Sequence, residues 1–103
     1  HEICIRDAQS ALDFLMTVSY ETGCDSIEIN KEAITPDFFI LSTGSAGEIL
    51  QKFINYRCKL AIVGDFSGYT SKPLKDFMYE SNNGRDIFFV SSEEEAIEKL
   101  SRI

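Results

Sequence analysis

Apolar residues recur at helical spacing in four segments of the chain, and each segment starts at a serine or a proline. Residues at i, i+3, i+4 and i+7 share one face of a helix. The pattern therefore predicts helices that begin at Ser10, Ser45, Pro73 and Ser92, the first of which ends at Gly23. The predicted inward faces are Ala11, Phe14, Leu15 and Val18; Ile49, Leu50, Phe53 and Ile54; Leu74, Phe77 and Met78; and Ala96, Ile97 and Leu100.

Short apolar or alternating runs separate these helices and predict four strands, at residues 3–5, 26–30, 59–65 and 86–90. A further apolar stretch at residues 38–41 predicts a short buried element. Strands that alternate with helices favour right-handed crossovers and a parallel sheet. We therefore expect one α/β domain over residues 1–103, with about four strands in a mostly parallel or mixed sheet and four helices in β-α-β-α-β-α-β-α order.

Three of the predicted helices begin with a serine followed three residues later by an acid, the pattern of a capping box. The pairs are Ser10 with Asp13, Ser45 with Glu48, and Ser92 with Glu95. Because the pattern recurs where no site is suspected, Ser45 and Glu48 are explained as helix caps. The same residues also allow a functional interpretation, since a helix N-terminus favours an anion.

In a parallel sheet, the loops that follow the strands lie at one edge, and ligands bind there at the switch point in the strand order. We expect Arg6 and Asp7 at this edge together with two richer loops. The candidate ligand- or partner-binding residues are Ser42, Thr43, Gly44, Ser45, Gly47 and Glu48 in "STGSAGE", and Asp65, Ser67, Tyr69, Ser71 and Lys72 in "GDFSGYTSK".

Each of these loops leaves two interpretations open. The loop "STGSAGE" lacks the lysine of a P-loop and the full GxGxxG pattern, so nucleotide hydrolysis is unsupported. In the second, Asp65 either caps a turn or holds a ligand hydroxyl or a magnesium-bound water. Lys72 is either solvated or paired with an anion. No paired carboxylates at catalytic spacing are present, so we name no catalytic residue.

The net charge of −7 opposes binding to nucleic acid, which needs a basic face. Three cysteines, Cys4, Cys24 and Cys58, without CxxC spacing indicate a reducing compartment, and Cys4 and Cys58 are expected in the core. The single histidine, His1, makes a Cys–His pair or a zinc site improbable. We expect no metal and no cofactor. No apolar run is long enough to span a membrane, so we expect a cytoplasmic protein.

The motifs "AGEILQKF", "NY", "AIVGDF", "SKPLKDFMYESN" and "FF" follow one another over nearly the whole chain. In this order they resemble an uncharacterised bacterial domain-of-unknown-function family. That resemblance implies a small cytoplasmic protein without an established activity. It also suggests a further N-terminal segment, such as another strand, ahead of Ile3.

More distantly, the layout is similar to the STAS domain of sulfate transporters and anti-sigma-factor antagonists. The antagonists carry a phosphorylatable serine before a helix of the form "SSGLGVIL", and "STGSAGEIL" is similar, with Ser42 and Thr43 at the hydroxyl positions. Leu41 stands where the antagonists have an aspartate, and one residue is inserted. The resemblance implies a STAS-like fold and a phosphorylation switch, because a phosphate adds about −1.5 to −2 charge at a partner-binding surface.

Three hypotheses follow for the function. The first is a non-enzymatic regulatory or protein-interaction module that binds a protein partner or a small anion at the loop edge. The alternative is a small enzyme or binding protein for an anionic metabolite, with Asp65 and Lys72 in its site. The third is a self-associating domain that forms a homodimer through Tyr56 or Tyr69.

Overall fold

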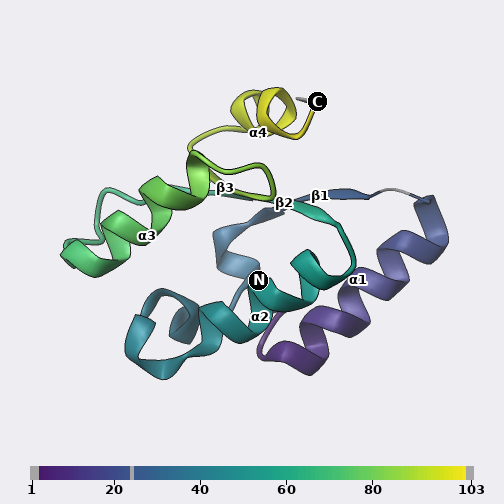
Figure 1. Cartoon of the computed structure of the whole chain (residues 1–103), viewed down its shortest axis with the longest axis horizontal. Coiled ribbons are helices and arrows are strands. Elements are labelled where there is room, and N and C mark those ends of the chain that lie inside the picture. The colour runs from purple at the N-terminus through teal and green to yellow at the C-terminus, as the bar shows by residue number, and fades with distance from the viewer. Residues whose placement is uncertain (1–2, 24, 102–103) are drawn as a thin grey trace.

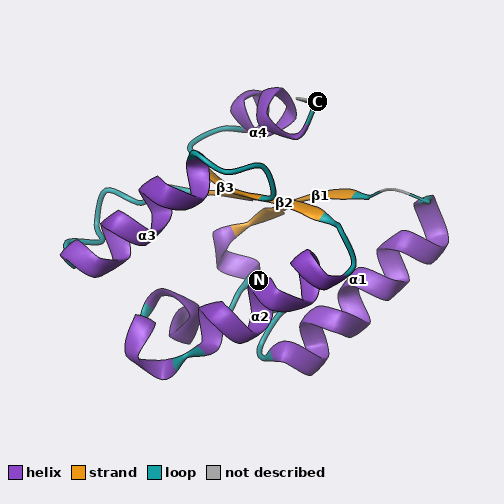
Figure 2. Ribbon diagram, in the orientation of Figure 1, coloured by secondary structure: helices purple, strands orange, loops and turns teal. Residues whose placement is uncertain are grey.

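The computed structural model describes residues 3–23 and 25–101, in which four α-helices and three strands alternate (Figures 1 and 2). The elements are α1 (Ala8–Thr22), β1 (Ser26–Asn30), α2 (Ser45–Asn55), β2 (Lys59–Val63), α3 (Lys72–Asn82), β3 (Ile87–Val90) and α4 (Glu93–Leu100). Three short 3-10 helices, η1 (Lys31–Ala33), η2 (Pro36–Phe39) and η3 (Leu41–Thr43), connect β1 to α2. No helix within these residues has the length and apolar character that a membrane span requires.

The three strands form a parallel sheet in the order β1-β2-β3. In this register Ile29 pairs with Ile62, and Ile62 pairs with Phe89. The expected α/β class and the parallel sheet are confirmed. The described residues hold three strands, however, where the sequence pattern predicted about four. The strand order also does not reverse, so these strands contain no switch point of the kind at which we expected a ligand.

The missing strand is the one predicted at residues 3–5. Ile5 forms only an isolated parallel bridge with Ile34. The N–H of Ile5 donates to the carbonyl of Ala33 (3.0 Å), and the carbonyl of Ile5 accepts from the N–H of Thr35 (2.8 Å). Beyond the bridge, the chain turns into Asp7, the N-cap of α1, while Ile34 lies between two 3-10 helices. Neither segment is extended for long enough to form a ladder.

Helices cover the two faces of the sheet unequally (Figure 1). α1, α2 and α3 lie on one face and α4 lies alone on the other. Right-handed crossovers between strands in sequential order place both crossover helices, α2 and α3, on the same face. Since β3 is the last strand, α4 does not lead to another strand and packs on the opposite face, where it contacts all three strands.

Alternation along the strands divides the core into two parts. Ile27, Ile29, Leu60, Ile62 and Phe89 belong to the large cluster under α1, α2 and α3, whereas a smaller cluster lies under α4. The smaller cluster consists of Ala61, Phe88, Val90 and Ala96, with Val63 and Leu100 against it. All the predicted inward residues of α1 and α3 are buried or partly buried.

Three residues expected in the core lie at the surface. Ile54 is 44% exposed and Ile97 is 63% exposed. Cys4 is exposed because its segment forms no strand, while Cys58 is buried as expected. Cys24 and His1 lie outside the described residues.

The helix caps agree with the predicted boxes in part. Ser92 does cap α4 by accepting from the N–H of Glu95 (3.2 Å), although Glu95 Oε1 reaches back to Ser91 rather than to Ser92. For α1, the prediction that Ser10 is the cap is wrong. Asp7 is the N-cap and Ser10 is the third helical residue that completes the box. The hydrogen bonds that the backbone and the side chain of Ser10 form with Asp7 hold the pKa of Asp7 below its ordinary value.

The predicted box of Ser45 and Glu48 does not form. The N-cap of α2 is Gly44, in a left-handed conformation with φ of 78°, and Ser45 is already helical. The N–H of Glu48 donates to the carbonyl of Gly44 (3.2 Å) instead of to a serine hydroxyl. Because Gly44 has no side chain, the N-cap residue of α2 makes no side-chain hydrogen bond to the helix.

The short buried element predicted at residues 38–41 consists of 3-10 turns. Pro36 begins η2, and the hydroxyl of Thr35 accepts from the N–H of Asp37 (3.4 Å). Phe38 and Phe39 are buried, whereas Ile40 is largely exposed. The two phenylalanines therefore bring apolar side chains to the sheet without adding a strand.

Candidate functional site

The ends of the parallel strands place three connections at one edge of the sheet, which we call the carboxyl edge. Lys31 follows β1, Gly64 follows β2 and Ser91 follows β3. The loop after β2 is the predicted "GDFSGYTSK" loop. In it, Asp65 Oδ1 accepts from both the N–H (2.9 Å) and the hydroxyl (2.6 Å) of Ser67. These hydrogen bonds, with a smaller contribution from the charge of Lys31, hold the pKa of Asp65 below its ordinary value. Asp65 therefore acts as the cap of a turn.

Lys31 is a cation at this edge that the sequence analysis did not single out. Its Nζ donates to the backbone carbonyl of Asp65 (2.9 Å). The same atom lies 4.9 Å from the ring centre of Tyr69 and 5.8 Å from that of Phe66. A cation within about 6 Å of an aromatic face is attracted by the ring. Lys31, the residue after β1, thus contacts Asp65, Phe66 and Tyr69 of the loop after β2.

Aromatic rings from two distant segments meet beside Lys31. Phe39 of η2 stacks on Tyr69 with ring centres 5.0 Å apart and planes 18° apart. Phe66 lies 6.1 Å from each of these rings and packs edge-on against Phe89 of β3 at 5.6 Å. The rings hold the loop after β2 against η2. The sequence analysis placed Phe39 in an apolar run, Phe89 in a strand and Tyr69 among the candidate binding residues, but it did not predict that these rings meet.

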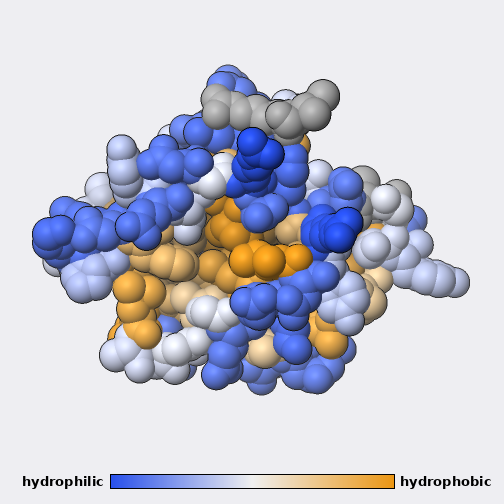
Figure 3. All heavy atoms as spheres, viewed as in Figure 1, coloured by the Kyte–Doolittle hydropathy of each residue, from blue (hydrophilic) through white to orange (hydrophobic). Residues whose placement is uncertain are grey.

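A cleft of about 300 Å³ opens beside this aromatic cluster. We call it the carboxyl-edge cleft, and its lining residues are Ile3, Lys31, Glu32, Ile34, Pro36, Phe39 and Tyr69. Among the described lining residues the walls are mainly apolar, and Lys31 and Glu32 are the charged side chains. Figure 3 shows apolar residues at the surface in the middle of the view, in the region between α3 and α1 of Figure 1.

The "STGSAGE" loop forms the start of α2 and has its own internal bonds. The hydroxyl of Thr43 lies 2.8 Å from the carbonyls of Asp37 and of Ile40, and it accepts from the N–H of Ser45 (3.2 Å). Ser42 is exposed and its side chain forms no hydrogen bond with any residue that the structure describes. Gly47 and Glu48 are also exposed, on the first turns of α2.

The two predicted loops are not joined directly. Among the described residues, no hydrogen bond or ion pair links residues 42–48 to residues 65–72. Their connection runs through η2, whose Phe39 stacks on Tyr69. Of the predicted residues, only Tyr69 lines the carboxyl-edge cleft.

Ser71 and Lys72 have local roles. Ser71 is the N-cap of α3 and accepts from the N–H of Leu74 (3.4 Å), and Pro73 occupies the first turn as expected. Lys72 Nζ lies 2.8 Å from Asp76 Oδ2, one helical turn further on, and this hydrogen bond raises the pKa of Lys72. Because both partners are largely exposed, the pair contributes little to stability.

The carboxyl edge combines an apolar cleft with charged side chains. No group of three potential metal ligands exists in the part of the chain that the structure describes. Asp65 Oδ1 already accepts two hydrogen bonds from Ser67. What remains is a cleft with aromatic and aliphatic walls and a charged margin.

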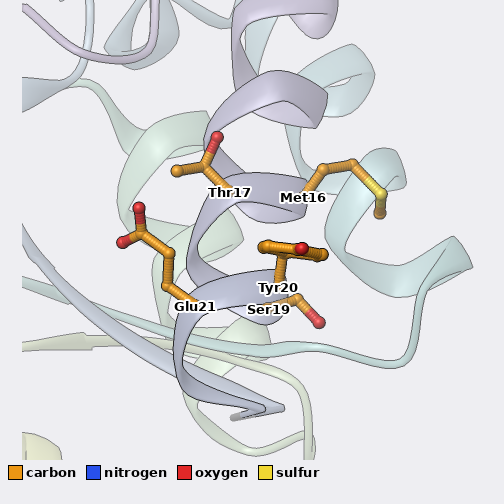
Figure 4. Close-up of a pocket in the computed structure, with 5 residues that line it drawn as sticks. All are labelled: Met16, Thr17, Ser19, Tyr20 and Glu21. Atoms are coloured by element: carbon orange, nitrogen blue, oxygen red, sulfur yellow. The ribbon is translucent and has the colours of Figure 1, made fainter.

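A larger cleft, of about 560 Å³, lies along the outer side of α1. Figure 4 shows its five lining residues, all from this one helix, with Met16 and Tyr20 on one side and Thr17 and Glu21 on the other. Tyr20 is 93% exposed. Because its described lining residues all come from one helix, polar groups from different elements do not converge among them, as they usually do in a binding site.

Comparison with known proteins identifies the family but no function. Neither the curated proteins nor the solved structures include a match to this chain. The finer likeness to STAS domains stays a prediction. A family model for a domain of unknown function, DUF4180, matches residues 1–100, which is nearly the whole chain. The chain therefore belongs to the DUF4180 family.

Proposed function

We propose that this domain is a non-enzymatic binding module that holds a protein partner at the carboxyl edge of its sheet. The observation that carries the proposal is the carboxyl-edge cleft, where Lys31 lies over Tyr69 and Phe39 stacks beside them. Aromatic residues dominate the energetics of protein interfaces, and they do so best in apolar pockets with a polar rim. A volume of about 300 Å³ suits one or two inserted side chains rather than a large cofactor.

The residues that line the cleft also indicate which side chains the partner inserts. Its apolar wall, which includes Ile34 and Pro36, favours an aliphatic or aromatic anchor side chain. Lys31 at the margin favours a carboxylate next to that anchor, although its Nζ already donates to the carbonyl of Asp65. We therefore expect a segment that combines an apolar anchor with an acidic residue.

The resemblance to STAS-domain antagonists adds a regulatory role to this proposal. Ser42 is the better candidate for the modified hydroxyl, because its side chain is exposed, whereas the hydroxyl of Thr43 holds the turn before α2. Ser42 lies in η3, which packs on the η2 segment that supplies Pro36 and Phe39 to the cleft. A phosphate there would add negative charge near the partner. The odd cysteine count without CxxC spacing supports a cytoplasmic location for such a module.

Site-specific photo-crosslinking in cells tests the partner proposal. A photoreactive residue replaces Pro36, which is exposed and lines the cleft, and the control carries it at Lys75, which is exposed on α3. We expect a discrete crosslinked protein from position 36 that is absent from position 75. Lys31→Met is expected to reduce the yield. Identical crosslink patterns from both positions would contradict the proposal.

The regulatory part has its own test. Ser42→Asp is expected to change the recovery of the crosslinked partner, while Ser42→Ala is expected to leave it unchanged. Equal recovery with both variants would remove the support for a switch at Ser42 without affecting the binding proposal.

The second candidate is an enzyme or binding protein for an anionic metabolite at the same edge, and Lys31 is the observation that favours it. A ligand present at a hundred times its dissociation constant adds about 2.7 kcal/mol of stability. A thermal-shift screen of phosphorylated and carboxylated metabolites would reveal such a ligand. A stabilising ligand whose effect disappears in Lys31→Met would favour this candidate over a protein partner.

A further inference from the structure

Cationic side chains from three elements meet at the edge of the sheet opposite the carboxyl edge. A cavity of about 510 Å³ lies there, between the start of β2, the turn before β3 and the end of α4. We call it the amino-edge cavity. Its lining includes Lys59 from β2, Arg85 and Asp86 before β3, and Lys99 from α4. In a chain with a net charge of −7, three cations around one cavity stand out against the overall charge.

Two of the three cations in this lining have no ion pair among the described residues. Arg85 and Lys99 form no ion pair with any acidic side chain that the structure describes, and Asp86 is the only carboxylate in the described lining. Lys99 Nζ lies 5.9 Å from the ring centre of Phe88, which is 3% exposed and supplies an apolar wall. By contrast, Lys72, which lies elsewhere on the surface, forms an ion pair with Asp76.

We propose that the amino-edge cavity binds a small molecule through a phosphate or polyphosphate group. A guanidinium fork such as that of Arg85 matches the oxygens of a phosphate, and ammonium groups add charge without demanding one geometry. The side-chain amide of Asn83, which also lines the cavity, supplies a neutral donor. The apolar ring of Phe88 lowers the local dielectric, so each charge–charge attraction is stronger than in water.

The size of the cavity and the charge of the chain favour a compact anion. A nucleic acid backbone would extend beyond the three cations over a surface that is acidic overall, where it would be repelled. A phosphate held between Arg85 and Lys99 stays within the cavity. This site is separate from the carboxyl-edge cleft, so its occupancy does not depend on the proposed partner.

A titration of the whole ¹⁵N-labelled chain with inorganic pyrophosphate, followed by two-dimensional NMR, tests the proposal. The test variant is Arg85→Gln/Lys99→Gln, and the control is Lys52→Gln/Lys75→Gln, which removes the same charge from α2 and α3. For the wild type we expect saturable shifts of the amides of residues 83–88 and of Lys99. The test variant should bind pyrophosphate at least about tenfold more weakly, because the loss of a hydrogen bond to a charged group has an effect of this size. The control should bind pyrophosphate like the wild type.

Three results would overturn the proposal: no saturable shifts, shifts that centre on Lys31 and Tyr69 instead, or equal weakening in both double variants. Equal weakening in both double variants would mean that pyrophosphate binding depends only on the net charge of the chain. If the double test variant does not fold, Arg85→Gln alone serves, because Arg85 is exposed and makes no hydrogen bond among the described residues.

Discussion

The side chain of Lys31 crosses closely over the backbone of Gly64. A Cβ atom at position 64 would lie 2.6 Å from both Cγ and Cδ of Lys31 and 3.1 Å from its Cβ. The glycine thus leaves the space through which Lys31 reaches the carbonyl of Asp65 and the face of Tyr69. Because Gly64 has no side chain at the end of β2, the side chain of Lys31 at the end of β1 can lie across it.

Gly64→Ala is therefore expected to destabilise the fold by about 1–3 kcal/mol, as overpacking does, and to displace Lys31 from the cleft. Gly68→Ala is the control, because a Cβ there would meet nothing within 4 Å. Urea unfolding measures both. In a Lys31→Ala background the cost of Gly64→Ala should fall, which a double-mutant cycle would detect. An unchanged cost would show that the lysine is not the obstacle.

Asn82 closes the outer edge of the sheet. Its Nδ2 donates to the carbonyl of Phe89 (3.1 Å), and its Oδ1 accepts from the N–H of Phe89 (2.6 Å). The side-chain amide therefore takes the place of a further strand at this position of β3. Asn82→Ala is expected to cost about 1–3 kcal/mol in urea unfolding, because it leaves a backbone donor and acceptor without partners.

Asn83→Ala, at the exposed neighbouring residue, is the control for this edge and is expected to be nearly neutral. The Asn82 variant should also aggregate more readily on partial unfolding, since an open strand edge pairs with other chains. Equal stability of the two variants would contradict the role of Asn82.

Two glycines of one loop should respond with opposite signs to the same substitution. Gly44 has φ of 78°, where an alanine is strained, so Gly44→Ala is expected to destabilise by about 1 kcal/mol. Gly47 lies within α2 and its Cβ position is open, so Gly47→Ala is expected to stabilise by about 0.5–1 kcal/mol. Thermal unfolding of both variants distinguishes them, and a shift in the same direction would contradict the observed start of α2.

Two acids give opposite pH dependences of stability. Hydrogen bonds from Ser67 lower the pKa of Asp65 below its ordinary 3.8, so the ionised form stabilises the fold above that pH. The contribution is lost as the pH falls through the lower pKa of the folded state. Asp65→Asn is therefore expected to lose stability at neutral pH and little at strongly acidic pH, as measured by urea unfolding across the pH range.

Glu28 behaves in the reverse way. Glu28 is exposed, but desolvation by the atoms packed around it, with repulsion from Glu93, raises its pKa above the ordinary 4.5, so its ionisation disfavours the folded state. Glu28→Gln is expected to gain stability at neutral pH, and this gain should disappear as the pH falls below 4.5. A pH-independent effect for either variant would rule out the electrostatic cause.

Local patterns predicted the elements whose signals are contained within a few neighbouring residues. The strand at Ser26–Asn30 appears with the expected bounds, Gly23 ends α1 with φ of 69°, and Ser92 caps α4. At residues 3–5 the apolar run alone was misleading. A ladder requires an extended partner, and Ile34 offers only one residue between two 3-10 helices.

The candidate site was predicted less well than the fold. The expected edge and Tyr69 are part of the carboxyl-edge cleft, but Lys31 was not singled out, and Phe39 was predicted only as part of a short buried element. Some serines and acids that looked functional serve turns and caps, as Asp65 does with Ser67 and Ser71 does at the start of α3. A short polar side chain first satisfies its own backbone, which its pattern alone does not distinguish from a ligand site.

By itself, the sequence determined the alternation of strands and helices, the apolar faces and the acidic charge, since these depend on residue type and spacing. Only the tertiary structure decided which residues share a surface. It brought Lys31 beside Tyr69 and gathered Lys59, Arg85 and Lys99 around one cavity. Such meetings depend on strand order, register and helix placement, which arise from packing across the whole sheet rather than from any one segment.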